Sequence, residues 1–256
     1  MKLSSLKGEV HRSLEGIYQK LRAALFPNAH AQNKMQELFG AGYDSGDIER
    51  GLDDPLILQE YLDTGANYKM IFDELIKPRL QTSRVILEIG PGKGSWTRAV
   101  LNHFHAGTLI VVDRLPVEDM LRERCRGAGE RLKFYQTTDN DYSSFEDRSI
   151  DFVFSFGVFV HIPVPEIASI LKRLRSKMVP GGEIILQYSN WDKLDKWGWE
   201  RARVPVWFRD NPTHPKMWWT KNDCGTMERL SKEAGYDIES LDVSYFGTCS
   251  VLHLRA

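Results

Sequence analysis

The chain has 256 residues, of which 42% are hydrophobic and 27% are charged, as in an ordinary globular enzyme. Its 34 basic and 35 acidic residues leave a formal net charge of −1, so the overall charge gives no reason to expect a nucleic-acid partner. Cys125, Cys224 and Cys249 are far apart in the sequence, which argues against a disulfide framework and a thiolate zinc site.

Residues 1–82 are expected to form a helical extension. Apolar residues recur at helical spacing in residues 14–25 and 67–80, whereas the Gly- and Asp-rich stretch 41–55 is predicted to be a loop. The first residues are interrupted by charges and do not resemble a signal peptide. No stretch approaches the roughly 18 apolar residues of a membrane span. These features favour a cytoplasmic protein.

Residues 83–190 alternate between strand-like and helix-like segments. The predicted strands are residues 84–90, 108–113, 132–137, 150–156 and 182–188. The predicted helices between them are residues 96–104, 117–125 and 166–178. We expect Pro180, Gly181 and Gly182 to terminate the last of these helices. This alternation indicates an α/β fold with a doubly wound, mostly parallel sheet.

The last part of the chain has a different pattern. Six of the seven tryptophans fall between Trp191 and Trp219, among many charged residues. A helix is predicted at residues 226–236. Two strands, residues 238–246 and 249–256, are predicted to form an antiparallel hairpin around Gly247 at the edge of the sheet.

The first predicted strand leads into a glycine motif, Glu88-x-Gly90-x-Gly92-x-Gly94. A dinucleotide site of the form G-x-G-x-x-G would place the third glycine one residue later. In addition, a carboxylate at the end of the strand repels a phosphate but accepts a hydrogen bond from an ammonium group. The motif therefore predicts a ligand with a cationic amino-acid end and no phosphate, which disfavours an NAD-dependent oxidoreductase.

Two further acidic positions follow at informative spacing. Asp113 ends the second predicted strand, 23 residues after Gly90, where a carboxylate can accept hydrogen bonds from two ribose hydroxyls. Asp139 and Asn140 lie in a turn-like stretch before the fourth predicted strand. In order and spacing, these three motifs resemble those of class I (Rossmann-like) S-adenosylmethionine-dependent methyltransferases, over about residues 83–190.

The resemblance implies a seven-stranded sheet with the last strand antiparallel, formed by a methyltransferase domain at residues 83–256. Residues 1–82 would cover its cofactor side, with the loop 41–55 as a candidate lid and Tyr68 as a candidate contact of the methionine carboxylate. The cofactor would be S-adenosyl-L-methionine, with S-adenosyl-L-homocysteine as product. The cofactor-binding residues implied are Glu88, Gly90, Gly92, Gly94, Asp113, Asp139, Asn140 and Phe156.

In this family the methyl acceptor lies near the end of the fourth strand, which makes His161 the candidate general base. The alternative is that His161 only positions its loop. Family members that use Mg²⁺ place a carboxylate where this chain has Gly157. Asp192 and Asp195 could supply part of a metal site, but Mg²⁺ is not indicated and no metal ligands are predicted.

Residues 191–220 are predicted to form a substrate lid, with Tyr188, Trp191, Trp197 and Trp199 as candidate substrate-binding residues. Aromatic faces mixed with polar groups suit a sugar, although several of these tryptophans could instead fill a second small core. We therefore predict O-methylation of a hydroxyl on a sugar, glycan or other polar small molecule.

The alternatives are methylation of an amine or an aromatic natural product, and a cofactor-binding protein without turnover. RNA methylation is disfavoured because the sequence has no basic run. The sequence does not determine the oligomeric state, and a homodimer is one option.

Overall fold

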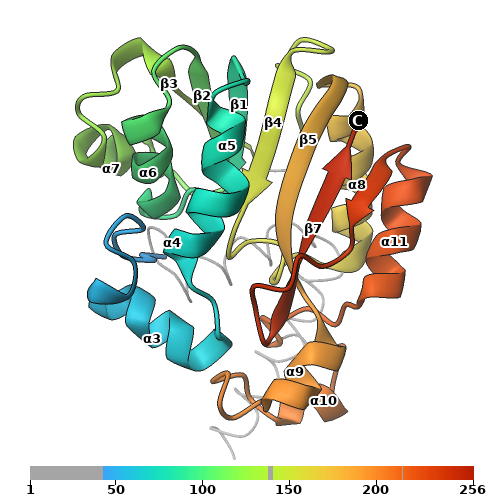
Figure 1. Cartoon of the computed structure of the whole chain (residues 1–256). Helices are drawn as coiled ribbons and strands as arrows, with labels where there is room; N and C mark the ends of the chain where they lie inside the picture. Colours follow the sequence, from blue (N-terminus) through green and yellow to red (C-terminus); the bar gives the residue numbers. More distant parts are fainter. Residues whose placement is uncertain (1–42, 138–140, 215) are drawn as a thin grey trace, which may run out of the picture.

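The computed structural model describes residues 43–137, 141–214 and 216–256 of the chain. The predicted helix at residues 14–25 lies outside the described residues, as do Asp139 and Asn140. All seven strands of one sheet fall within the described ranges (Figure 1).

The sheet has the strand order β3-β2-β1-β4-β5-β7-β6. Strands β1 to β5 pair in parallel, and β7 runs antiparallel to both β5 and β6. This confirms the predicted mostly parallel sheet with an antiparallel last strand. The strand bounds are β1 Val85–Ile89, β2 Thr108–Asp113, β3 Leu132–Gln136, β4 Ile150–Ser155, β5 Met178–Ser189, β6 Asp237–Ser240 and β7 Cys249–Arg255.

Helices cover both faces of the sheet, because its central strands are apolar on both sides and must be buried on both. One core contains side chains of the helices from α3 to α7, and the other contains side chains of α8 and α11. The α-helix bounds are α3 Pro55–Thr64, α4 Tyr68–Ile71, α5 Lys77–Leu80, α6 Ser95–His103, α7 Glu118–Arg124, α8 Val164–Arg175, α9 Trp191–Trp197, α10 Trp207–Asp210 and α11 Cys224–Glu233. The shorter turns are η1 Gly51–Asp53, the π-helical η2 Phe72–Ile76 and η3 Gly129–Arg131.

The predicted helix at residues 67–80 forms as α4, η2 and α5 in succession, with Asn67 as its N-cap. Before it lies α3, whose N-cap Asp54 accepts hydrogen bonds from the backbone N–H groups of Leu56 and Ile57. Residues 43–54 carry no α-helix or strand, in line with the predicted loop. None of the helices in the described ranges has the length and apolarity needed to cross a bilayer.

Two sequence predictions near the sheet were wrong in their bounds. Helix α8 ends at Arg175, and Pro180 to Gly182 lie inside β5 as an irregularity, where the pairing with β4 shifts register. A bulge accommodates Pro180, which has no N–H to donate, while the Gly181 N–H donates to the Ala256 carbonyl. In the hairpin, β6 stops at Ser240 and a loop extends to β7.

Candidate functional site

The glycine loop joins β1 to α6, and two other segments approach it closely. A side chain at Gly90 would place its Cβ 2.2 Å from Val158 Cγ2, in the loop after β4. At Gly92 the Cβ would lie 2.6 Å from the Tyr43 carbonyl oxygen. Both residues have positive φ, 72° and 53°, which other residues adopt at a cost. Glycine is therefore required here by close packing as well as by the turn.

Glu88 lies in β1 at the base of this loop and is almost completely buried, with 2% of its surface exposed. Its carboxylate accepts a hydrogen bond of 2.7 Å from Thr97 Oγ1. Burial raises the pKa of Glu88 to about 8; the negative charge of Asp113 also raises it, and the Thr97 hydrogen bond lowers it. The carboxyl group is therefore mostly protonated at pH 7.

This protonation state gives a testable prediction for cofactor binding. An ammonium group that approaches Glu88 favours the carboxylate, so binding at pH 7 should release about one proton, and the release should fall toward zero as the pH rises through about 8. Calorimetric titrations in buffers of different ionisation enthalpy measure this number. The Glu88→Gln variant keeps the shape of the side chain and should abolish the release. An unchanged proton release in the Glu88→Gln variant would contradict the assignment of this release to Glu88.

Asp113, at the end of β2, faces the same loop. Its carboxylate accepts a hydrogen bond of 2.8 Å from the backbone N–H of Leu115, and the Gly90 N–H donates to the carbonyl of the preceding residue, Val112, at 2.8 Å. Helix α7 begins five residues later, with Val117 as its N-cap, so Asp113 does not cap that helix. Burial raises the pKa of Asp113. The structure thus brings Glu88 of β1 and Asp113 of β2 together with the glycine loop.

The segment Tyr43–Gly46 lies on the glycine loop. The Lys93 N–H donates to the Tyr43 carbonyl at 2.9 Å, and the Ser45 N–H donates to Ser95 Oγ at 3.1 Å. Arg124 forms an ion pair with Asp44 at 2.9 Å. The described part of the predicted lid therefore covers the loop, and its opening for the cofactor remains a prediction.

A layer of aromatic rings packs around Trp96, which follows the glycine loop. Trp96 was not among the predicted site residues; it lies in the first turn of α6 and stacks on Phe156 with ring centroids 4.2 Å apart. Tyr68 packs against Trp96 with ring centroids 5.3 Å apart and is buried. The only local signal for Trp96 was a large aromatic residue two positions after the last glycine of the motif.

The loop after β4 carries His161 and is attached to the Trp-rich segment. His161 Nδ1 donates to the Trp218 carbonyl at 2.5 Å, and the Thr220 N–H donates to the Val160 carbonyl at 2.8 Å. Within the loop, the Gly157 N–H donates to Gln187 Oε1 at 2.7 Å. Because Nδ1 carries the proton in this arrangement, the neutral imidazole has its lone pair on Nε2.

Three of the four candidate substrate residues are packed in the interior. Trp191 and Trp199 are 7% and 4% exposed and contact each other edge to face at 4.9 Å. Tyr188 has no exposed surface, and its hydroxyl donates to the Leu241 carbonyl at 2.8 Å. This packing is the core arrangement that the sequence analysis kept as the alternative, and a substrate role for these three remains a prediction.

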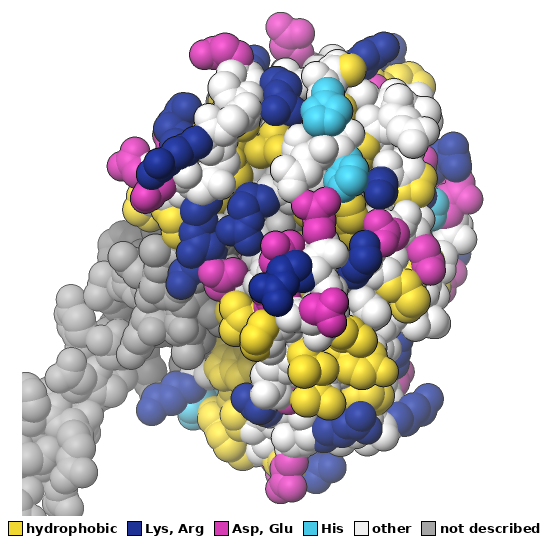
Figure 2. Space-filling model, turned by 60° about the vertical axis from the view of Figure 1, so that its left-hand side comes forward, with side chains coloured by type: hydrophobic (Ala, Val, Ile, Leu, Met, Phe, Trp, Pro, Cys, Tyr) yellow, Lys and Arg dark blue, Asp and Glu magenta, His cyan; other side chains and the backbone are white. Residues whose placement is uncertain are grey.

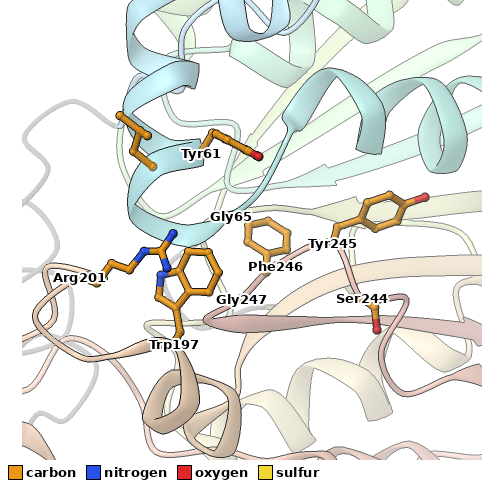
Figure 3. A pocket seen from close by; sticks show the side chains of 9 residues that line it. Tyr61, Gly65, Trp197, Arg201, Ser244, Tyr245, Phe246 and Gly247 are labelled. Carbon is orange, nitrogen blue, oxygen red and sulfur yellow. The ribbon is translucent and has the colours of Figure 1, made fainter.

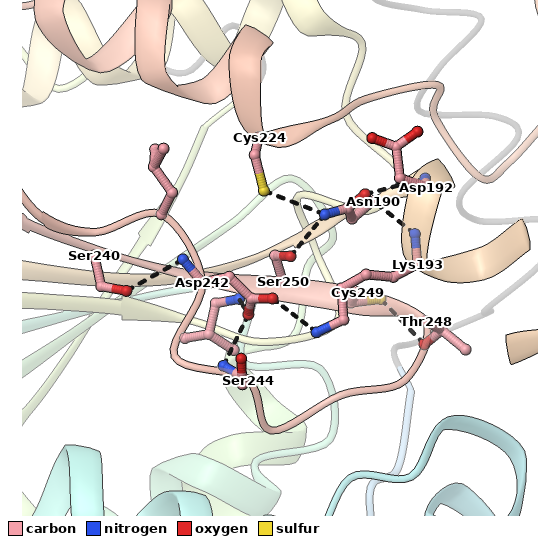
Figure 4. A network of polar contacts seen from close by, with 12 residues as sticks. Asn190, Asp192, Lys193, Cys224, Ser240, Asp242, Ser244, Thr248, Cys249 and Ser250 are labelled. Atoms are coloured by element: carbon pink, nitrogen blue, oxygen red, sulfur yellow. Dashed lines mark hydrogen bonds and ion pairs between the residues drawn. The ribbon is translucent and has the colours of Figure 1, made fainter. Parts of the chain in front are cut away.

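A polar network attaches α9 to β7 and the loop before it (Figure 4). Asn190 caps α9 and donates to Ser250 Oγ at 2.9 Å, and Lys193 pairs with Asp242 at 2.8 Å. Asp242 also accepts from the backbone N–H of Ser244. These contacts hold α9, and with it Trp197, at a defined position beside the loop that precedes β7.

Trp197 lines a hollow of about 350 Å³ between α3, α9 and the loop before β7 (Figure 3). The Arg201 guanidinium lies over the Trp197 ring, 3.6 Å from the ring centroid. Trp197 Nε1 donates to the Asp63 carbonyl at 2.7 Å. The hollow is lined by Tyr61, Leu62, Gly65, Trp197, Arg201, Ser244, Tyr245, Phe246 and Gly247. Apolar side chains gather in the lower part of the face shown in Figure 2, and Leu58, Tyr61 and Leu62 of α3 are exposed. Of the predicted substrate residues, Trp197 is therefore the one at an accessible hollow.

Comparison with known proteins identifies the central part of the chain. Residues 86–182 match the family model described as "Methyltransferase domain". This match covers the glycine loop, the acid of β2 and the loop with His161. The chain therefore contains a methyltransferase domain, of the class I, S-adenosylmethionine-dependent type. No curated protein matched the chain.

Solved structures share the fold of this methyltransferase at low sequence identity. An O-methyltransferase family protein from Burkholderia thailandensis has a TM-score of 0.55 at 16% identity, over 73% of this chain and 54% of its own. A protein from Pyrococcus horikoshii OT3 has a TM-score of 0.53 at 19% identity, over 73% of this chain and 90% of its own. An S-adenosylmethionine-dependent methyltransferase from Methanosarcina mazei has a TM-score of 0.52 at 16% identity, over 71% and 96% of the two chains. The methyltransferase thus spans about half of the Burkholderia protein and nearly all of the other two.

The described parts of the methyltransferase contain no group of three or more His, Cys, Asp or Glu side chains that could hold a metal ion. Of the two aspartates considered in the sequence analysis, Asp195 accepts a hydrogen bond of 2.5 Å from Trp199 Nε1. The Asp192 backbone N–H donates to the cap residue Asn190. Both aspartates are exposed on α9.

Proposed function

We propose that this methyltransferase transfers a methyl group from S-adenosylmethionine to a hydroxyl group of a sugar, a glycan or another polar small molecule. The observation that carries the proposal is the position of the His161 loop. Val158 of this loop packs against Gly90 of the glycine loop, and the His161 imidazole is held by the Trp218 carbonyl. These contacts support a proton acceptor beside the proposed cofactor site.

The residues of this site fit the cofactor. The glycine loop carries no side chains at Gly90, Gly92 and Gly94, and the buried Glu88 and the partly buried Asp113 lie next to it. Glu88 would accept a hydrogen bond from the ammonium of the methionine part, and Asp113 would accept from the ribose hydroxyls. Asp139 and Asn140, outside the described residues, are proposed to contact the adenine. When bound, the cofactor supplies a methyl group on a positively charged sulfur.

His161 would act on the acceptor. A neutral alcohol is a weak nucleophile, and removal of its proton as it attacks the methyl carbon lowers the barrier. With Nδ1 donating to the Trp218 carbonyl, Nε2 is the atom that would accept this proton. The same hydrogen bond keeps the ring from rotating, so the loop also aligns acceptor and methyl group.

The hollow beside Trp197 supports a polar acceptor with an aromatic contact surface. Its volume of about 350 Å³ is within the range of small-molecule sites, roughly 300–1,000 Å³. Phe246 lines it and packs on Tyr68 at 6.1 Å, and Tyr68 packs on Trp96, which stacks on Phe156. A layer of aromatic rings therefore connects the hollow to the proposed methyl-transfer site. We propose that the hollow binds the part of the acceptor that is not methylated.

The test is transfer of labelled methyl from S-adenosylmethionine to a panel of sugars, glycosides and oligosaccharides, with phenols and amines alongside. We expect label on a carbohydrate hydroxyl. Label on phenols alone would keep O-methylation and replace the sugar by an aromatic natural product. Label on amines alone would contradict O-methylation. Cofactor binding without transfer to any acceptor would favour a binding protein.

A further inference from the structure

Trp219 carries a buried donor that has no partner among the described residues. Its side chain is 9% exposed, and its Nε1 atom makes no hydrogen bond within residues 43–137, 141–214 and 216–256. The neighbouring tryptophans differ: Trp191 Nε1 donates to the Thr220 carbonyl at 3.0 Å and Trp199 Nε1 donates to Asp195 at 2.5 Å. A buried N–H without an acceptor lowers stability, so such groups are rare unless a ligand completes them.

This unpaired donor lies beside the proposed base. The rings of Trp219 and His161 are 6.1 Å apart between centroids and nearly perpendicular, at 84°. The backbone holds Trp219 on both sides, because the Trp218 carbonyl accepts from His161 and the Thr220 N–H donates to Val160. The Thr220 carbonyl also accepts from Ser189 Oγ at 2.5 Å. The position of the indole is therefore fixed by the same contacts that fix the imidazole.

We infer that the Trp219 indole N–H donates a hydrogen bond to the acceptor oxygen during methyl transfer, an inference that rests on the proposed function. The hydroxyl proton passes to His161, one oxygen lone pair forms the bond to the methyl carbon, and the electron pair of the broken carbon–sulfur bond remains on sulfur. The second oxygen lone pair accepts from Trp219. This hydrogen bond strengthens as negative charge develops on the oxygen.

The pair of Trp219 and His161 selects for oxygen over nitrogen. A neutral amine has one lone pair, which must attack the methyl carbon, so a donor aimed at that nitrogen competes with the reaction. An alcohol has two lone pairs and can satisfy the donor and react at once. Trp219 is thus a specificity-determining residue for a hydroxyl acceptor.

The test compares Trp219→Phe with Trp199→Phe. Both substitutions shrink a buried indole to a phenyl ring and leave space in the packing. Trp219→Phe leaves no acceptor without its donor, so its melting temperature should fall less than that of Trp199→Phe, while kcat on the hydroxyl acceptor falls about 10-fold and cofactor affinity is unchanged. Trp199→Phe leaves Asp195 without its donor and should lower the melting temperature. A 10-fold fall in kcat with a smaller loss of stability than in Trp199→Phe is not expected of a residue that only packs.

Three outcomes would overturn the inference. A Trp219→Phe enzyme with kcat within twofold of the wild type on a hydroxyl acceptor removes Trp219 and leaves O-methylation intact. A fall in kcat together with a melting temperature as low as that of Trp199→Phe, or lower, assigns Trp219 to packing. Transfer by the wild type to amines alone overturns the inference and the proposed function together.

A second measurement on the wild type covers the case in which the variant does not fold. With ¹⁵N-labelled tryptophan, the seven indole groups give separate signals. Saturation with S-adenosylhomocysteine and the hydroxyl acceptor should move one of them downfield, because a new hydrogen bond forms. The cofactor product alone is the control. Absence of any such shift with the acceptor would overturn the inference.

Discussion

The His161→Ala variant should lower kcat on a hydroxyl acceptor by about 10²-fold or more, with cofactor affinity unchanged. The reason is the loss of the proton acceptor, since general base catalysis contributes about 10²–10⁴-fold. The imidazole also connects its loop to the Trp218 carbonyl, so part of the loss would be positional. Single-turnover methyl transfer and equilibrium binding of S-adenosylhomocysteine separate the two effects.

A second variant distinguishes the base from a positioning role. His161→Gln offers an amide N–H to the Trp218 carbonyl but cannot take up a proton, so it should remain as slow as His161→Ala. Recovery of activity in the glutamine variant would assign His161 to positioning, the alternative kept in the sequence analysis. The matched control is His105→Ala, at an exposed position after α6, which should behave as the wild type.

The Asp113→Asn variant should weaken cofactor binding by about 10²-fold. A carboxylate can accept hydrogen bonds from both ribose hydroxyls, and a hydrogen bond to a charged group is worth about 1.5–3 kcal/mol. Asparagine retains one oxygen for the Leu115 N–H, so the turn after β2 should persist. Equilibrium titration with S-adenosylmethionine measures the affinity, and circular dichroism checks the fold.

The control for this prediction is Asp119→Asn, an exposed aspartate in the first turn of α7. It removes the same charge a few residues away and should leave the affinity unchanged. If both variants bound the cofactor as the wild type does, Asp113 would have no role in the ribose contact. If both weakened binding equally, the effect would be one of overall charge.

Most of the sheet could be predicted because its signals are local. Apolar runs such as residues 108–113 are buried on both faces wherever they lie in the sheet, and the helices between them have a clear period. The predictions that failed concern segments whose ends depend on pairing with a strand that is distant in sequence. Pro180 and Gly181 normally end a helix, yet here β4 and Ala256 pair around them and keep them in β5. The pairing partner was not visible in the local pattern.

The same division applies to the site. The glycine motif and its spacing to Asp113 identified the class of cofactor, because these residues follow directly from the ends of two adjacent parallel strands. The sequence could not say which tryptophans pack inside. Trp191 and Trp199 are buried, whereas Trp197 lines the hollow, and all three come from one short segment of similar composition.

The sequence by itself therefore determined the order of strands and helices, the type of sheet and the kind of ligand that the glycine loop receives. These follow from short-range periodicity and from residues that are close along the chain. Tertiary structure alone decided that Tyr43 covers the glycine loop and that Trp218 holds His161. It also decided that the Trp219 N–H beside His161 has no acceptor in the part of the chain that the structure describes. Each depends on contacts between segments about 50 residues or more apart, or on the absence of such a contact, and no local pattern encodes them.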